Sequence, residues 1–141
     1  MKTEEYTRLI DSALETFNNH NIEKFMEFYD ESAIHTQPTQ EKPLKGRDAI
    51  RKDYEKSTFI PFPDVKFKKT NIFGHGNWWC VEGIFEGTHK ESIEGSNGEM
   101  IPATNKKVSV PICLVFKIVN GKVTEAHEYN DQLGFLAQLG L

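Results

Sequence analysis

The sequence predicts a single domain of the α+β class, in which a curved antiparallel sheet wraps over about three N-terminal helices. Apolar residues in the first half of the chain recur at steps of three and four, which is the spacing of an amphipathic helix. After Asp64 the pattern changes to long apolar and aromatic runs separated by turn residues. The 141 residues contain no repeat and no linker, so we expect one domain spanning residues 1–141. A curved sheet over helices would enclose a pocket.

Three helical segments are expected before residue 64. The first has Thr3 as a candidate N-cap and a stripe formed by Tyr6, Leu9, Ile10, Ala13, Leu14 and Phe17. The polar run 18–21 ends it, and a shorter stripe follows in 22–29. A brief strand is expected at 32–35 and a polar loop at 36–45. The third helix begins at Gly46 and ends before Pro61.

Four strands are expected in the second half of the chain. Their ranges are 65–73, 78–89, 108–119 and 122–130. The polar segment 90–105 separates the second strand from the third and is interpreted as a long loop. Residues 133–139 have the apolar pattern of one or two final helical turns.

The dipeptide Asn120-Gly121 is typical of a type I′ hairpin turn, and it fixes a register for the last two strands. Val119 then faces Lys122, and Ile118 faces Val123. A regular ladder continues with Phe116 opposite Glu125, Leu114 opposite His127 and Ile112 opposite Tyr129. Side chains alternate between faces, so His127, Tyr129 and Asp131 would share the face of the apolar residues. A one-residue slip or a β-bulge would turn them outward.

This register predicts a pocket with acid/base chemistry. A carboxyl group among apolar side chains has a raised pKa, which suits Asp131 to general acid/base work near neutral pH. His127 or Tyr129 could hold an enolate oxygen. The remaining pocket residues predicted are His35, Trp79, Ile112, Leu114 and Phe116.

Structural roles compete with these functional ones. Asp131 could instead cap the final helix, and the two roles are compatible. His127 could be a hydrogen-bonded structural histidine, and His35 an exposed residue at the edge of a loop. A metal site made of His127 and Asp131 with His35 or His89 fits no recognised ligand spacing, so no metal is expected.

Composition argues against several other classes of protein. The net charge is −4 and no block of Lys or Arg occurs, which disfavours a nucleic-acid partner. No run approaches the roughly 18 apolar residues that a membrane span requires, and the N-terminus lacks the pattern of a signal peptide. We therefore expect a cytoplasmic protein without a membrane partner. Cys80 and Cys113 lie in apolar runs and are expected to be buried free thiols.

The order of several short segments resembles the SnoaL-like polyketide cyclases of the NTF2-like superfamily. These segments are Ala33-Ile34-His35 with Pro38, 46–50, 62–64, 83–89, 102–106, 120–125, Asp131 and 138–140. The resemblance implies an NTF2-like cone, a homodimer or higher homo-oligomer, and no metal or organic cofactor. It also implies that Asp131 is the acid/base of an aldol-type ring closure. His127 stands where the family usually has Trp, which makes the expected pocket more polar.

Two kinds of function follow from these expectations. The first is an enzyme in which Asp131 removes a proton beside a carbonyl of a small apolar compound, with cyclisation or isomerisation as the outcome. The alternative is a non-catalytic module that binds a small apolar ligand or dimerises. An epoxide hydrolase or dehydratase would need a second carboxylate and an intervening Arg, whereas Arg47 and Arg51 lie on an early helix.

Overall fold

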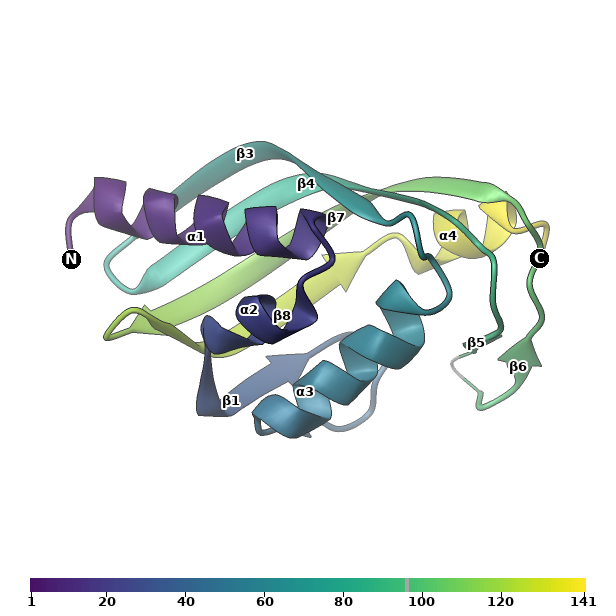
Figure 1. The fold of residues 1–141 in the computed structure, drawn as a ribbon, viewed down its shortest axis with the longest axis horizontal. Helices are drawn as coiled ribbons and strands as arrows, with labels where there is room; N and C mark the ends of the chain where they lie inside the picture. The colour runs from purple at the N-terminus through teal and green to yellow at the C-terminus, as the bar shows by residue number, and fades with distance from the viewer. Residues whose placement is uncertain (96) are drawn as a thin grey trace.

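The computed structural model describes residues 1–95 and 97–141, and it confirms the predicted α+β class. Figure 1 shows one long, curved sheet with α1, α2 and α3 packed on one of its faces and α4 at the C-terminal end. The helices are α1 (Thr3–Asn18), α2 (Ile22–Glu27), α3 (Arg47–Tyr54) and α4 (Gln132–Gln138). A π-helical turn, Glu55–Phe59, extends α3 before the prolines.

The main sheet has six strands in the order β2-β1-β8-β7-β4-β3. Their bounds are β1 (Tyr29–Thr36), β2 (Leu44–Lys45), β3 (Lys66–His75), β4 (Trp78–Thr88), β7 (Lys107–Val119) and β8 (Lys122–Asn130). All neighbours are antiparallel except β1 and β8, which run parallel. The parallel pair places the first strand beside the last hairpin, so segments from both halves of the chain lie side by side (Figure 1).

Two local predictions were wrong. The segment 90–105 is not entirely loop, since β5 (Ile93–Glu94) and β6 (Met100–Ile101) form a small separate hairpin within it. Thr3 does not cap α1, because the cap position is Lys2 and no side chain bonds the free amides there. Gly46 does precede α3, with a φ of 92° that disfavours a residue bearing a Cβ.

The predicted hairpin register is correct only near the turn. Asn120 and Gly121 both have positive φ, as a type I′ turn requires, and Ile118 pairs with Val123. Beyond that pair the register shifts, and Lys117 pairs with Glu125. Thr124 is therefore the extra residue of a β-bulge on β8, and its hydroxyl donates to the carbonyl of Lys117 at 3.3 Å. The bulge exchanges the two faces of β8 from residue 125 onward.

The hydrophobic core lies between the helices and the inner face of the sheet. Buried residues of α1, α2 and α3 meet those of β4, β7 and β8, with aromatic rings of Phe17, Phe25, Tyr29 and Tyr54 packed edge to face. Cys80 and Cys113 are free thiols but only half-buried, with their sulfurs 3.2 Å apart on neighbouring strands. Among the described helices, none combines the length and the apolar character needed to cross a membrane.

Candidate active site in the cavity between sheet and helices

A cavity of about 320 Å³ opens between α3, the inner face of the sheet and α4. One wall is apolar and carries side chains of β4, β7, α4 and the loop after the π-helical turn, among them Phe62, Phe85, Val110, Ile112 and Phe135. The other wall is polar and consists of His35, Gln37, Gln40, Asp53, Glu128 and Asn130. The cavity can thus take a ligand with one polar and one apolar side.

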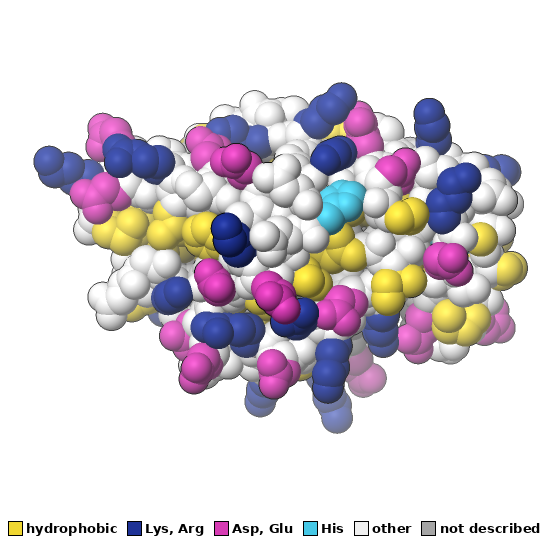
Figure 2. Space-filling model, viewed as in Figure 1, with side chains coloured by type: hydrophobic (Ala, Val, Ile, Leu, Met, Phe, Trp, Pro, Cys, Tyr) yellow, Lys and Arg dark blue, Asp and Glu magenta, His cyan; other side chains and the backbone are white. Residues whose placement is uncertain are grey.

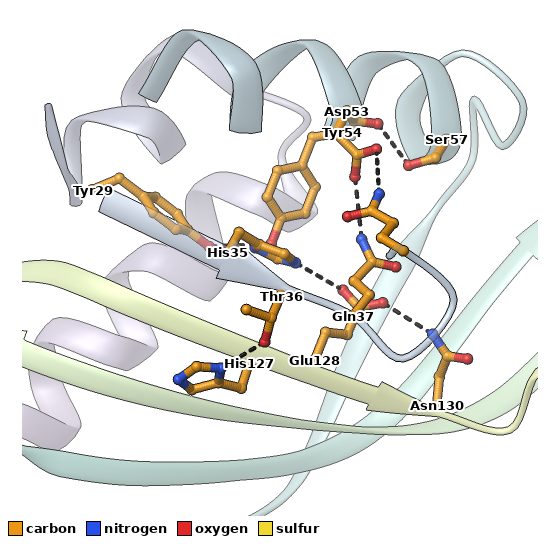
Figure 3. A network of polar contacts seen from close by, with 11 residues as sticks. Tyr29, His35, Thr36, Gln37, Asp53, Tyr54, Ser57, His127, Glu128 and Asn130 are labelled. Atoms are coloured by element: carbon orange, nitrogen blue, oxygen red, sulfur yellow. Dashed lines mark hydrogen bonds and ion pairs between the residues drawn. The ribbon is translucent and has the colours of Figure 1, made fainter. Parts of the chain in front are cut away.

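Glu128 is the central polar group of this cavity (Figure 3). It projects inward from β8 with 17% of its side chain exposed, and its Oε1 lies 3.8 Å from Nε2 of His35. Asn130 donates an amide N–H to Oε2 at 3.0 Å, which leaves Oε1 the less engaged oxygen. Burial raises the pKa of Glu128 to about 7, the Asn130 bond opposes this rise, and the charge of Asp53 adds to it. The carboxyl group can therefore both accept and release a proton near neutral pH.

His35 faces Glu128 from β1 and is 2% exposed. Among the described residues, neither nitrogen of its ring has a hydrogen-bond partner. Burial, and to a smaller degree the charge on His127, lowers the pKa of His35 to about 4, so the imidazole is neutral at physiological pH. A buried imidazole with an unpaired N–H in a cavity wall is placed to donate a hydrogen bond to a ligand oxygen.

Asp53 supplies a second carboxyl group to the polar wall. The side-chain amides of Gln37 and Gln40 donate to its two oxygens at 3.2 and 3.0 Å, and Ser57 donates to its backbone carbonyl at 2.6 Å. Burial raises the pKa of Asp53, while the amide bonds from the two glutamines oppose this rise. The amides hold this carboxyl group on the α3 side of the polar wall, whereas Glu128 projects from β8 (Figure 3).

Two tyrosines lie at the inner end of the site, and Tyr54 lines the cavity there. The hydroxyls of Tyr29 and Tyr54 lie 3.1 Å apart and bond to each other. Burial raises the pKa of both phenols well above the ordinary value. They stay neutral at any physiological pH and serve as walls rather than as acids.

Some predicted pocket residues do line cavities. His35 and Ile112 line the cavity described above. Leu114 and Phe116, again with Ile112, line a second cavity of about 80 Å³ beneath α1. Trp79 lines neither: it is 4% exposed, stacks on Tyr6 and donates its indole N–H to the carbonyl of Gly76.

His127, Tyr129 and Asp131 do not reach the cavity, contrary to the predicted geometry. The bulge at Thr124 turns His127 and Tyr129 to the outer face of the sheet. There His127 bonds Thr36 at 2.6 Å and stacks beside Trp78, and Tyr129 is 52% exposed. Asp131 is exposed and caps α4, accepting from the amide of Gly134 at 2.9 Å. The capping role considered for Asp131 is thus the one its geometry supports.

Glu128 and Asp53 were missed, although the sequence contains a signal for each. Val123 and Ala126 are both apolar but three residues apart, which a regular strand cannot place on one face. That spacing indicates a bulge and puts Glu128 on the inner face. Asp53 follows Ile50 at helical spacing and precedes Tyr54, so it is a carboxylate on an apolar stripe.

Within residues 1–95 and 97–141, no three His, Cys, Asp or Glu side chains lie close enough together to hold a metal ion. The described side chains of the cavity include a carboxyl group with a pKa near 7 beside a neutral imidazole.

Comparison with known proteins agrees with this architecture. AclR from Streptomyces galilaeus has a TM-score of 0.83 at 16% identity, over 99% of this chain and 98% of that one. IdmH from Streptomyces antibioticus has a TM-score of 0.78 at 21% identity, over 96% and 98%. TsrD from Streptomyces laurentii has a TM-score of 0.80 at 20% identity, over 99% and 98%. These likenesses confirm the expected NTF2-like fold.

A search of curated proteins finds no significant match. The family model described as SnoaL-like polyketide cyclase matches residues 7–139, which is nearly the whole chain. The protein therefore belongs to the SnoaL-like polyketide cyclase family.

Proposed function

We propose that the protein is a cofactor-independent acid/base enzyme that acts on a small, largely apolar carbonyl compound by cyclisation or isomerisation. The observation that supports this best is the pairing of Glu128, whose pKa is raised to about 7, with a neutral and unpaired His35 in one cavity. Membership of the family supports the same class of reaction. The catalytic carboxyl group proposed is Glu128 rather than Asp131.

Glu128 acts first as a base. Its ionised Oε1 takes a proton from the carbon next to the ligand's carbonyl, and the electron pair of that C–H bond forms the enolate. Asn130 holds Oε2, so the carboxylate presents a fixed oxygen to the ligand. A positioned base of this kind contributes roughly 10²- to 10⁴-fold to the rate.

His35 stabilises the enolate as it forms. A neutral imidazole donates its N–H to the developing oxyanion, and the dry surroundings strengthen that bond. Because the pKa of His35 is about 4, the ring stays neutral and does not compete for the proton that Glu128 has taken.

The same proton completes either outcome. In an isomerisation the protonated Glu128 returns it to another carbon of the enolate. In a cyclisation the enolate carbon attacks a second carbonyl of the same molecule, and Glu128 protonates the resulting alkoxide. The fold alone does not choose between reactions, since IdmH is a proposed polyketide cyclase and AclR a proposed hydroxylase.

Exchange of the α-hydrogens of simple ketones in D₂O, followed by NMR, tests this proposal without knowledge of the natural substrate. The protein should accelerate exchange of 2-methylcyclohexanone, and Glu128→Gln should abolish the acceleration. Glu125→Gln changes a carboxyl group three residues nearer the hairpin, on the outer face of β8, and should leave exchange unchanged. Equal exchange by wild type and Glu128→Gln would refute the assignment of the base.

A further inference from the structure

The second cavity, beneath α1, adjoins the first. Five residues line both of them, namely Tyr54, Thr58, Phe85, Ile112 and Glu128. Glu128 therefore stands at the boundary of two spaces of different character. The space outward of it, of about 320 Å³, has the polar wall, and the space beneath α1 measures about 80 Å³.

The walls of this inner cavity suit hydrocarbon. Its described lining is aliphatic and aromatic apart from Glu128 at the boundary, the Thr58 hydroxyl and two tyrosines, and includes Leu9, Ala13, Leu14, Leu114 and Phe116. The hydroxyls of Tyr29 and Tyr54 are bonded to each other, so they offer little to a polar ligand. A polar group placed here would lose its hydrogen bonds to water without replacement.

We propose that the inner cavity binds the hydrocarbon substituent on the reacting carbon of the ligand. This inference rests on the proposed function, because it uses Glu128 as the base. The reacting carbon then lies at the boundary beside Glu128, its carbonyl oxygen points into the outer cavity toward His35, and its substituent extends beneath α1. The ligand class is a ketone that carries an unbranched, uncharged alkyl group on the carbon that loses the proton.

Helix α1 sets the size of that substituent. Leu9, Ala13 and Leu14 lie half-buried on the side of α1 that faces the inner cavity, and Ala13 is the smallest of the three. Figure 2 shows hydrophobic side chains gathered along the lower side of α1 on the face in view. A larger side chain at residue 13 would occupy the space that the substituent needs.

A homologous series of ligands tests the assignment. The probes are 2-alkylcyclohexanones from methyl to butyl, with affinity measured by calorimetry. Affinity for the wild type should rise about fourfold with each added CH₂ group, as expected for burial of hydrocarbon. Ala13→Leu should remove this rise while keeping the affinity for the methyl compound within about twofold. Ser12→Leu, on the exposed side of the same helix, should retain the rise.

A wild type that binds all four ketones equally, or an Ala13→Leu variant that keeps the full rise, would overturn the proposal. If Ala13→Leu does not fold, Leu14→Ala serves in its place, since it enlarges the cavity. With 2-pentylcyclohexanone added to the series, this variant should bind the pentyl compound more tightly relative to the butyl compound than the wild type does; an unchanged ratio would also overturn the proposal. Glu128→Gln separates the two proposals. If Glu128→Gln loses hydrogen exchange but its affinity still rises with each added CH₂ group, both proposals are supported. If the variant keeps hydrogen exchange and its affinity still rises in this way, only the assignment of Glu128 as the base is refuted.

Discussion

Nε2 of His35 lies 3.8 Å from Oε1 of Glu128, and burial disfavours the charged form of each. In the unfolded chain, between pH 4.5 and 6.5, the histidine carries a proton and the glutamate does not. In the folded protein the pKa of His35 falls to about 4 and that of Glu128 rises to about 7, so the proton is on Glu128 instead. Folding thus moves a proton from one group to the other without changing the number bound.

This exchange predicts an unusual dependence of stability on pH. The raised pKa of Glu128 makes stability fall as pH rises from 4.5 to 7, and the lowered pKa of His35 makes it rise from pH 4 to 6.5. The two contributions cancel between pH 4.5 and 6.5. In Glu128→Gln only the histidine contribution remains. Between pH 4.5 and 6.5 the free energy of unfolding of this variant should therefore increase by about 3 kcal/mol more than that of the wild type.

Urea unfolding at pH 4.5, 5.5 and 6.5 measures this difference. Glu125→Gln, on the outer face, serves as the control and should follow the wild-type curve. Parallel curves for wild type and Glu128→Gln would mean that the glutamate titrates normally in the folded protein.

The neighbours of Glu128 should shift its titration in opposite directions. Asp53 raises the pKa of Glu128 by its charge, so Asp53→Asn should lower the midpoint of the pH profile of kcat/KM. The Asn130 amide favours the ionised form, so Asn130→Ala should raise that midpoint. Hydrogen exchange of 2-methylcyclohexanone from pH 5 to 9 gives the profile. Shifts of the same sign in both variants would contradict this account.

Asp131 should matter for stability and not for chemistry. Its side chain accepts from the amide of Gly134 at the start of α4, so Asp131→Ala should lower the free energy of unfolding by about 1 kcal/mol. Asp131→Asn keeps a good cap and should retain both stability and exchange activity. A folded Asp131→Asn protein without activity would restore Asp131 as the acid/base and displace Glu128.

The sequence was sufficient for the fold class and for most elements because those depend on repeated local patterns. The stripe of α1, the Asn120-Gly121 turn and the bounds of β8 each follow from several residues that agree. The site was harder to predict, because a single inserted residue determines which side chains of β8 point into the cavity. Thr124 is an ordinary strand former, and neither Gly nor Pro marks the bulge. The parallel pairing of β1 with β8 likewise joins segments about 90 residues apart, and no local sequence pattern predicts such a pairing.

Deleting Thr124 tests whether the pairing beyond the bulge is enough to place Glu128 in the cavity. Without Thr124, Glu125 would follow Val123 directly, and the observed pairs of Lys117 with Glu125 and of Leu114 with Glu128 would form a regular ladder. Glu128 would therefore still point inward, and the deletion variant should fold and keep its hydrogen exchange. Thr124→Ala keeps the residue count and loses only the bond to Lys117, so it should cost about 1 kcal/mol or less of unfolding free energy by urea unfolding. A folded deletion variant without hydrogen exchange would mean that the bulge itself, and not only the pairing beyond it, holds Glu128 in place.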